Sequence, residues 1–202
     1  NRAFDQTMRY DVEMKLKTPM TPEDAAYIYE TLKDAQAIDA TMAFSVYLYG
    51  KDGSVQNPYL VVMDDEQSGL HFAGADGREV TLADNGVLIT PRMAKALDVG
   101  IGSMMMAERL DGTAICFEVT DIIDFPVGNE IYISRTAFSK ISSLPFMINV
   151  LLIRGQDFQF HIDHSMLYNE LHPNAVKLAF IKGLRYLAAH GVNRCITSLN
   201  LE

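Results

Sequence analysis

The sequence predicts an α+β fold, and three kinds of local signal carry this prediction. The short apolar run Gly86–Ile89 is rich in branched side chains and too short for a helix, so it suits a buried strand. Threonines followed by proline, at Thr21 and Thr90, are typical helix starts. The pair Asp111-Gly112 lies between two strand-like runs and is the strongest short hairpin signal in the chain. Strands and helices are therefore expected to be interspersed.

The first part of the chain is expected to fold as strand, helix and two further strands. The strands cover 10–17, 41–49 and 59–63, and the helix covers 21–37. Thr21 caps this helix and Pro22 occupies its first position, where the missing N–H costs nothing. An apolar stripe at helical spacing predicts its buried face: Ala25, Ile28, Tyr29, Leu32 and Ala35.

The central segment is expected to alternate short strands and short helices. After the strand 86–89, Thr90 and Pro91 open a helix, and Gly100 and Gly102 turn the chain into a hairpin strand over 103–110. On the returning strand, apolar residues at 115, 117 and 119 alternate with Cys116 and its polar neighbours. A strand over 130–134 and a helix over 135–142 complete the segment. Beyond it we expect a strand over 148–153, a helix over 174–190 and a strand over 194–201.

The segment from Gly86 to Ile141 resembles the small extracytoplasmic subdomain of FtsX-like (MacB-type) permeases, the membrane subunits of one class of ABC transporter. The resemblance implies a larger βαβ-containing subdomain in two pieces, over 1–78 and 144–202, with a smaller β-rich subdomain over 79–143 inserted between them. Each flank alone would expose an apolar sheet face, so the two pieces are expected to form one layer pair.

The resemblance also implies a function without catalysis. The domain would lie on the extracytoplasmic side of the cell membrane, bind a substrate or partner protein, and transmit conformational change from the transmembrane helices of the same full-length permease. ATP hydrolysis would belong to a separate cytoplasmic ATPase subunit or domain. On this interpretation the chain is an excised, soluble piece of a membrane protein, not an enzyme by itself. Nothing in the sequence chooses the substrate.

The composition of the chain limits the classes of partner that it is expected to bind. The formal net charge is −9, from 26 acidic and 17 basic residues, and the basic residues are scattered, so nucleic acid is not an expected partner. The longest apolar run, Leu144–Ile153, has about half the roughly 20 residues that a membrane span needs. Cys116 and Cys195 form no disulfide framework, and we expect two buried thiols. A single disulfide between them is the alternative in an oxidising compartment.

One cluster has the residue types of a metal site: His161, Asp163, His164, Glu170 and His172. It lacks the spacing of a helical zinc motif, so we expect an exposed polar loop and no metal or cofactor. Because no nucleophile elbow or phosphate loop occurs, we name no catalytic residue. Two alternatives remain open: a metal-dependent enzyme or metal-binding module built on this cluster, and a soluble binding module unrelated to membranes.

The candidate partner-binding residues lie in and after the predicted hairpin. The run Met104 to Met106 suits either core packing, which we expect, or an adaptable surface or copper-binding patch. If it is exposed, Met104 and Met106 would form an apolar floor. Asp111, Asp124 and Glu130 would then give this surface an acidic rim suited to a cationic peptide.

Overall fold

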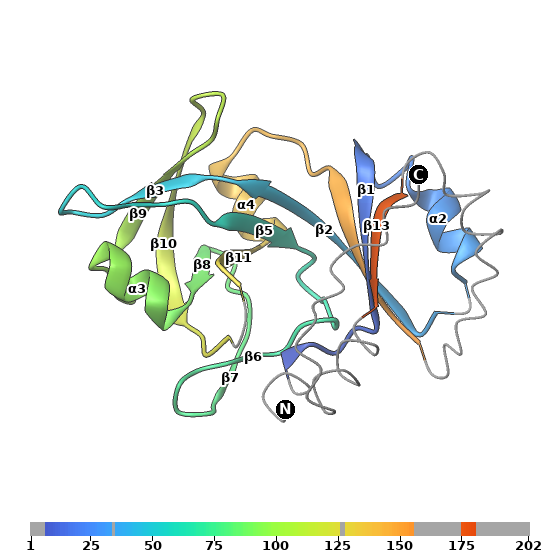
Figure 1. The fold of residues 1–202 in the computed structure, drawn as a ribbon, viewed down its shortest axis with the longest axis horizontal. Coiled ribbons are helices and arrows are strands. Elements are labelled where there is room, and N and C mark those ends of the chain that lie inside the picture. Colours follow the sequence, from blue (N-terminus) through green and yellow to red (C-terminus); the bar gives the residue numbers. More distant parts are fainter. Residues whose placement is uncertain (1–6, 34, 126–127, 156–174, 181–202) are drawn as a thin grey trace. The chain divides into compact units, whose positions relative to one another are not determined.

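The computed structural model describes residues 7–33, 35–125, 128–155 and 175–180 (Figure 1). These residues form an α+β fold, as predicted, with short helices among many more strands. They fall into two compact units. The first unit draws on 1–41, 68–70 and 146–202, and the second on 42–67 and 71–145. The expected subdomain boundaries differ from this division chiefly over 42–67, and they stay a prediction.

The strands of the first unit lie in the order β13 (Ala175–Phe180), β1 (Val12–Met20), β12 (Ile148–Arg154) and β2 (Ala37–Ser45). Residues 37–41 of β2 belong to this unit. Each strand is antiparallel to its neighbour: Val12 lies opposite Ile153, and Thr41 lies opposite Val150. β1 and β2 are therefore parallel to each other with β12 between them. The helix α2 (Ala26–Thr31) connects β1 to β2.

The helix α2 buries the predicted stripe against this sheet. Ala25, Ile28 and Leu32 lie in a core cluster with Val12, Met14, Leu16, Ala40, Ile148, Leu151 and Ile153, and Tyr29 and Ala35 pack against it half-buried. The helix is shorter than the predicted 21–37. Thr21 does cap a turn, accepting a hydrogen bond from Asp24 N–H at 3.1 Å, but Ala26 N–H and Ile28 N–H bond three residues back, which tightens the backbone before α2 begins.

The helix predicted over 174–190 is wrong for its first part, because residues 175–180 form the strand β13. Its register on β1 runs from Leu16 opposite Ala175 to Val12 opposite Phe180. Without β13, β1 would leave a row of backbone donors and acceptors unpaired on one side, and residues 175–180 satisfy these groups by pairing with β1. The rest of that predicted helix, and the strand predicted over 194–201, lie outside the described residues.

Seven strands of the second unit lie side by side in the order β5-β11-β8-β10-β9-β3-β4. Its strands are β3 (Tyr47–Tyr49), β4 (Val55–Gln56), β5 (Tyr59–Met63), β8 (Gly86–Ile89), β9 (Met104–Glu108), β10 (Ala114–Ile122) and β11 (Glu130–Ser134). β11 is parallel to β5, and β10 is parallel to β8. The pairs β8–β11, β9–β10, β3–β9 and β3–β4 are antiparallel. A separate ribbon pairs β6 (Phe72–Ala73) with β7 (Glu79–Val80).

Two short helices of the second unit begin as the sequence predicts. Thr90 Oγ1 accepts a hydrogen bond from Met93 N–H at 3.3 Å, and Pro91 opens α3 (Pro91–Leu97). Ser134 Oγ accepts from Ala137 N–H at 3.0 Å and caps α4 (Arg135–Ile141). Phe138 of α4 is buried in the core of this unit. Asp98, in the left-handed region at φ 52°, ends α3, a position the sequence did not indicate.

Candidate functional site

The candidate site lies on the β9–β10 hairpin, which projects from the second unit in Figure 1. At its tip, Gly112 N–H donates to Arg109 O, and Arg109 N–H donates to Thr113 O, both at 2.9 Å. Gly112 has φ 80°, so the loop is a three-residue turn that closes with a glycine bulge. The hairpin predicted from Asp111-Gly112 is confirmed.

A second glycine bulge closes the other end of the hairpin. Gly102 N–H donates to Val119 O at 2.8 Å, Val119 N–H donates to Ser103 O at 2.9 Å, and Gly102 has φ 83°. Two such bulges bracket the five paired positions of β9 and fix their register. The predicted turn at Gly102 is thus part of what sets the strand pairing.

The bulges also decide which cross-strand pairs lie closest. Met106 lies opposite Cys116, and Met104 lies opposite Glu118. In antiparallel strands, hydrogen-bonded and non-hydrogen-bonded pairs alternate. The pair of Arg109 with Thr113 at one end and that of Ser103 with Val119 at the other are hydrogen-bonded. By alternation, the pairs Met106–Cys116 and Met104–Glu118 are therefore of the non-hydrogen-bonded kind. Opposite Cα atoms in such pairs lie about 4.5 Å apart, which brings the side chains close together.

The two faces of this hairpin differ sharply in burial. On the inner face, alternate residues are core: Met105, Ala107, Ile115, Phe117 and Val119 are at most 7% exposed. On the outer face, Met104 is 67% exposed and Met106 is 48% exposed. The pairing of β3 with β9 and β4 extends this outer face, which we call the methionine face and define by its exposed members: Tyr49, Val55, Met104, Met106 and Cys116.

Two expectations are corrected by this arrangement. Core packing of the methionine run holds for Met105 alone, because strand alternation turns Met104 and Met106 outward. The expected burial of the thiols is wrong for Cys116, which is exposed and free, since it alternates with Ile115 and Phe117. Cys195 lies outside the described residues.

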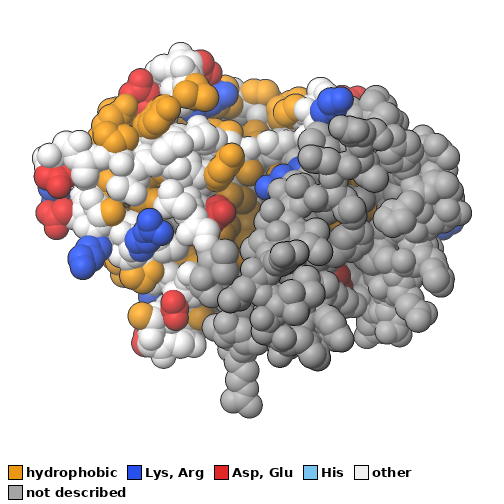
Figure 2. Space-filling view, viewed as in Figure 1, with side chains coloured by type: hydrophobic (Ala, Val, Ile, Leu, Met, Phe, Trp, Pro, Cys, Tyr) orange, Lys and Arg blue, Asp and Glu red, His pale blue; other side chains and the backbone are white. Residues whose placement is uncertain are grey.

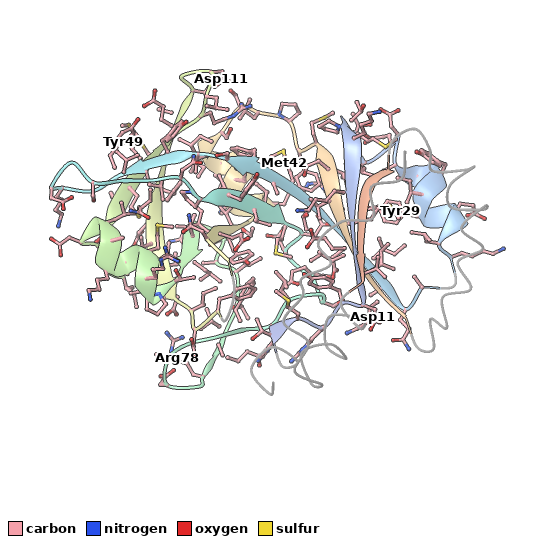
Figure 3. The ribbon with its side chains drawn as sticks, in the orientation of Figure 1. Asp11, Tyr29, Met42, Tyr49, Arg78 and Asp111 are labelled. Atoms are coloured by element: carbon pink, nitrogen blue, oxygen red, sulfur yellow. The ribbon has the colours of Figure 1, made fainter. Side chains whose placement is uncertain are left out.

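Figure 2 shows apolar side chains gathered over the part of the second unit where Figure 1 draws β3 and β9, with acidic side chains beside them. Tyr49 and Asp111 are labelled in this region in Figure 3. Tyr49 Oη donates a hydrogen bond to Glu108 Oε2 at 3.1 Å across β3 and β9. This bond raises the pKa of Tyr49 above its ordinary value of 10.0. No local pattern in the sequence indicates this pair, because Tyr49 and Glu108 meet only through strand pairing.

The hairpin tip is held by a stacked arginine. The Arg109 guanidinium carbon lies 5.1 Å from the centroid of the Phe44 ring, and Phe44 meets Phe138 of α4 edge-on at 6.1 Å. Arg109 also pairs with Asp111 at 3.3 Å. Asp111 accepts a hydrogen bond from Thr113 N–H at 3.0 Å, which lowers the pKa of Asp111 below its ordinary 3.8. The tip therefore presents a fixed carboxylate.

The three acidic candidates do not form one rim. Asp111 precedes β10 and Asp124 follows it, and a strand of nine residues spans about 30 Å at roughly 3.3 Å per residue. Asp124 is exposed, and its N–H donates to Ala73 O at 2.8 Å. Glu130 is half-buried at the start of β11, opposite Tyr59. Of the three, only Asp111 lies at the hairpin tip. Met106 lies closer to this tip than Met104 does.

The alternative metal cluster, His161, Asp163, His164, Glu170 and His172, lies outside the described residues. Within the part of the chain that the structure describes, no three side chains of the His, Cys, Asp and Glu types stand together as a metal site. None of the helices in residues 7–33, 35–125, 128–155 and 175–180 has the length and hydrophobicity needed to cross a membrane.

No protein-family model matches the sequence, and no curated protein is similar to it at a significant level. Among solved structures, the periplasmic region of MacB from Actinobacillus actinomycetemcomitans matches with a TM-score of 0.56 at 9% identity, over 92% of this chain and 95% of that one. The extracellular domain of the noncanonic ABC-type transporter YknZ from Gram-positive bacteria matches with a TM-score of 0.49 at 13% identity, over 94% of this chain and 99% of that one. On the first match, the predicted resemblance is confirmed at the level of fold: this chain has the fold of the MacB periplasmic region.

Proposed function

We propose that this chain is an extracytoplasmic domain of an ABC transporter permease, anchored by transmembrane helices of the same full-length protein and working with a cytoplasmic ATPase. The observation that carries the proposal is the match in fold to a MacB periplasmic region over nearly the whole length of both chains. The order of short strands, helices and hairpin over 86–141, which suggested the same family from sequence, supports it independently of the strand pairings.

The domain acts by binding a substrate or partner protein and passing on motion from the membrane helices. Two features of the second unit support a binding role for the hairpin: exposed Met104 and Met106 on one face, and the fixed carboxylate of Asp111 at the tip. Binding residues concentrate where loops are held by a rigid scaffold, and the two glycine bulges and the Arg109 stack supply that rigidity. Asp124, which follows β10, and Glu130, at the start of β11, are acidic positions separate from the hairpin tip.

The membrane location is tested with the exposed thiol of Cys116. In the full-length protein, with Cys116 as the sole cysteine, a membrane-impermeant maleimide added to spheroplasts labels the protein before lysis if the domain is extracytoplasmic. The Cys116→Ser variant gives the background. Labelling that appears only after lysis overturns the proposal. The complete reading frame offers a second check, because flanking apolar stretches of about 20 residues are required.

The binding role is tested in the same full-length protein by charge reversal. Asp111→Lys impairs transport or resistance without lowering expression, and Asp111→Asn serves as the matched variant because it removes the charge and keeps an acceptor for Thr113 N–H. Met106→Glu tests the apolar floor. An unchanged phenotype in both Asp111→Lys and Met106→Glu removes the hairpin from the binding site. The double variant Asp124→Lys and Glu130→Lys tests the two separate positions in the same assay.

A further inference from the structure

We propose that Met104, Met106 and Cys116 bind a soft monovalent metal ion, Cu(I) or Ag(I), on the outer face of the β9–β10 hairpin. The proposal rests on the placement of three sulfur atoms and does not depend on the proposed transporter function.

The strand register brings the three side chains to one face. Met106 lies directly opposite Cys116, in a pair of the close, non-hydrogen-bonded kind. Met104 precedes Met106 by two residues and therefore points to the same face, diagonal to Cys116. Long, flexible thioether side chains reach across such diagonals.

All three sulfur-bearing residues are accessible. Met104 is 67% exposed, Met106 is 48% exposed, and Cys116 is exposed with a free thiol. At this exposure, the side chains of Met104 and Met106 add little burial energy to the fold, so core packing does not explain them. The neighbouring Met105, by contrast, is only 7% exposed and packs in the core.

The charges around the sulfur atoms favour a cation. The register places Glu118 opposite Met104, and Glu108 two positions beyond Met106 on the same face. Among the described residues that strand pairing puts on this face, from Tyr47 and Tyr49 through β9 to β10, none is lysine or arginine. A cation bound at the sulfur atoms therefore meets negative charge from two carboxylates and no basic side chain in the ladder.

The donor set selects a soft ion. Thioethers and thiolate select Cu(I), whereas carboxylates and water suit hard ions such as Mg²⁺ and Ca²⁺. A single thiolate with two neutral thioethers lacks the imidazoles or additional thiolates of structural zinc sites.

The placement is tested by titrating the full 202-residue chain, labelled with ¹³C in the methionine methyl groups, with Ag(I), which is diamagnetic. Single Met→Leu variants assign the signals. The methyl signals of Met104 and Met106 shift together and saturate at one equivalent, while the signal of Met105, their buried neighbour, stays in place. Shifts confined to other methionines, or equal shifts at Met105, overturn the proposal.

The affinity is tested by anaerobic competition with a chromogenic Cu(I) chelator. Cys116→Ser weakens Cu(I) binding at least tenfold, and Met106→Leu weakens it to a smaller extent. Val55→Ala, on the same face without a donor atom, and Cys195→Ser both bind as the parent chain does. Equal affinity in the parent and Cys116→Ser overturns the proposal, as does loss of binding in Cys195→Ser alone. Thermal unfolding of each variant shows whether its fold is intact, and the exposed positions of Val55, Met106 and Cys116 tolerate substitution.

Discussion

Gly86 lies directly against the backbone of Glu118, where the parallel strands β8 and β10 meet. A Cβ atom at position 86 would overlap the Glu118 carbonyl oxygen and approach Thr120 Cγ2 to 2.7 Å. This close approach leaves no room for a Cβ atom, so the position suits glycine. This contact fixes β10, and with it the hairpin that carries the methionine face.

Gly86→Ala is therefore expected to destabilise the chain by about 1–3 kcal/mol, the usual range for overpacking a well-packed interior. The measurement is urea unfolding followed by circular dichroism. Gly100→Ala is the matched control, because a Cβ there meets nothing within 4 Å and the glycine has no positive φ. Equal loss in both variants would contradict the contact between β8 and β10.

The three consecutive methionines should differ in their contribution to stability. Met105→Ala is expected to cost about 2–5 kcal/mol because its side chain fills the core, whereas Met104→Ala and Met106→Ala should stay within about 0.5 kcal/mol of the parent. Chemical denaturation of the three variants checks this. A large loss in Met106→Ala alone would show that the strand alternation is the reverse of that described.

Gly112 should tolerate asparagine far better than valine. Its φ of 80° lies in the left-handed region, where a β-branched side chain costs about 1–2 kcal/mol and asparagine costs less. Gly112→Val is thus expected to lower stability and loosen the hairpin tip. Amide exchange reads this at Arg109, whose N–H donates to Thr113 O, and at Thr113, whose N–H donates to Asp111 Oδ1. If Gly112→Val and Gly112→Asn behave alike, the turn is not the glycine bulge described.

The phenol of Tyr49 should ionise at a higher pH than an ordinary tyrosine, because its hydrogen bond to Glu108 favours the protonated form. In Glu108→Gln the midpoint falls back toward 10.0, and ¹³C NMR of the tyrosine ring carbons measures it. A raised folded-state pKa stabilises the fold below pH 10, and this contribution is lost as the pH rises through the folded-state pKa. Identical Tyr49 midpoints in the two proteins would rule out the bond.

A fragment of residues 79–143 should fail to fold cooperatively, whereas 42–145 should fold. The shorter fragment lacks β5, the parallel partner of β11, and β3, the partner of β9, so two strands would present unpaired edges. Thermal melting by circular dichroism distinguishes the two. Cooperative melting of 79–143 alone would contradict this prediction and would show that β11 and β9 do not need their partners β5 and β3.

The sequence by itself determined those elements whose hydrogen bonds close within a few residues. Thr90 caps α3 through Met93, three positions away, and the Asp111-Gly112 turn is closed by bonds between Arg109 and Thr113. Such contacts depend on local chain geometry alone, so the residue types reveal them. The alternation along β10 likewise determined which of its residues face the core.

Only the tertiary structure decided how residues distant in the chain are used. Residues 175–180 satisfy a helical pattern, yet they pair with Leu16 to Val12 because the edge of β1 offers backbone partners that no local pattern records. The meeting of Met106 with Cys116, and of Tyr49 with Glu108, likewise depends on strand register. Side-chain type sets what each residue can bind, but the pairing of strands sets which donors share a face, and that is decided by backbone hydrogen bonds between remote segments.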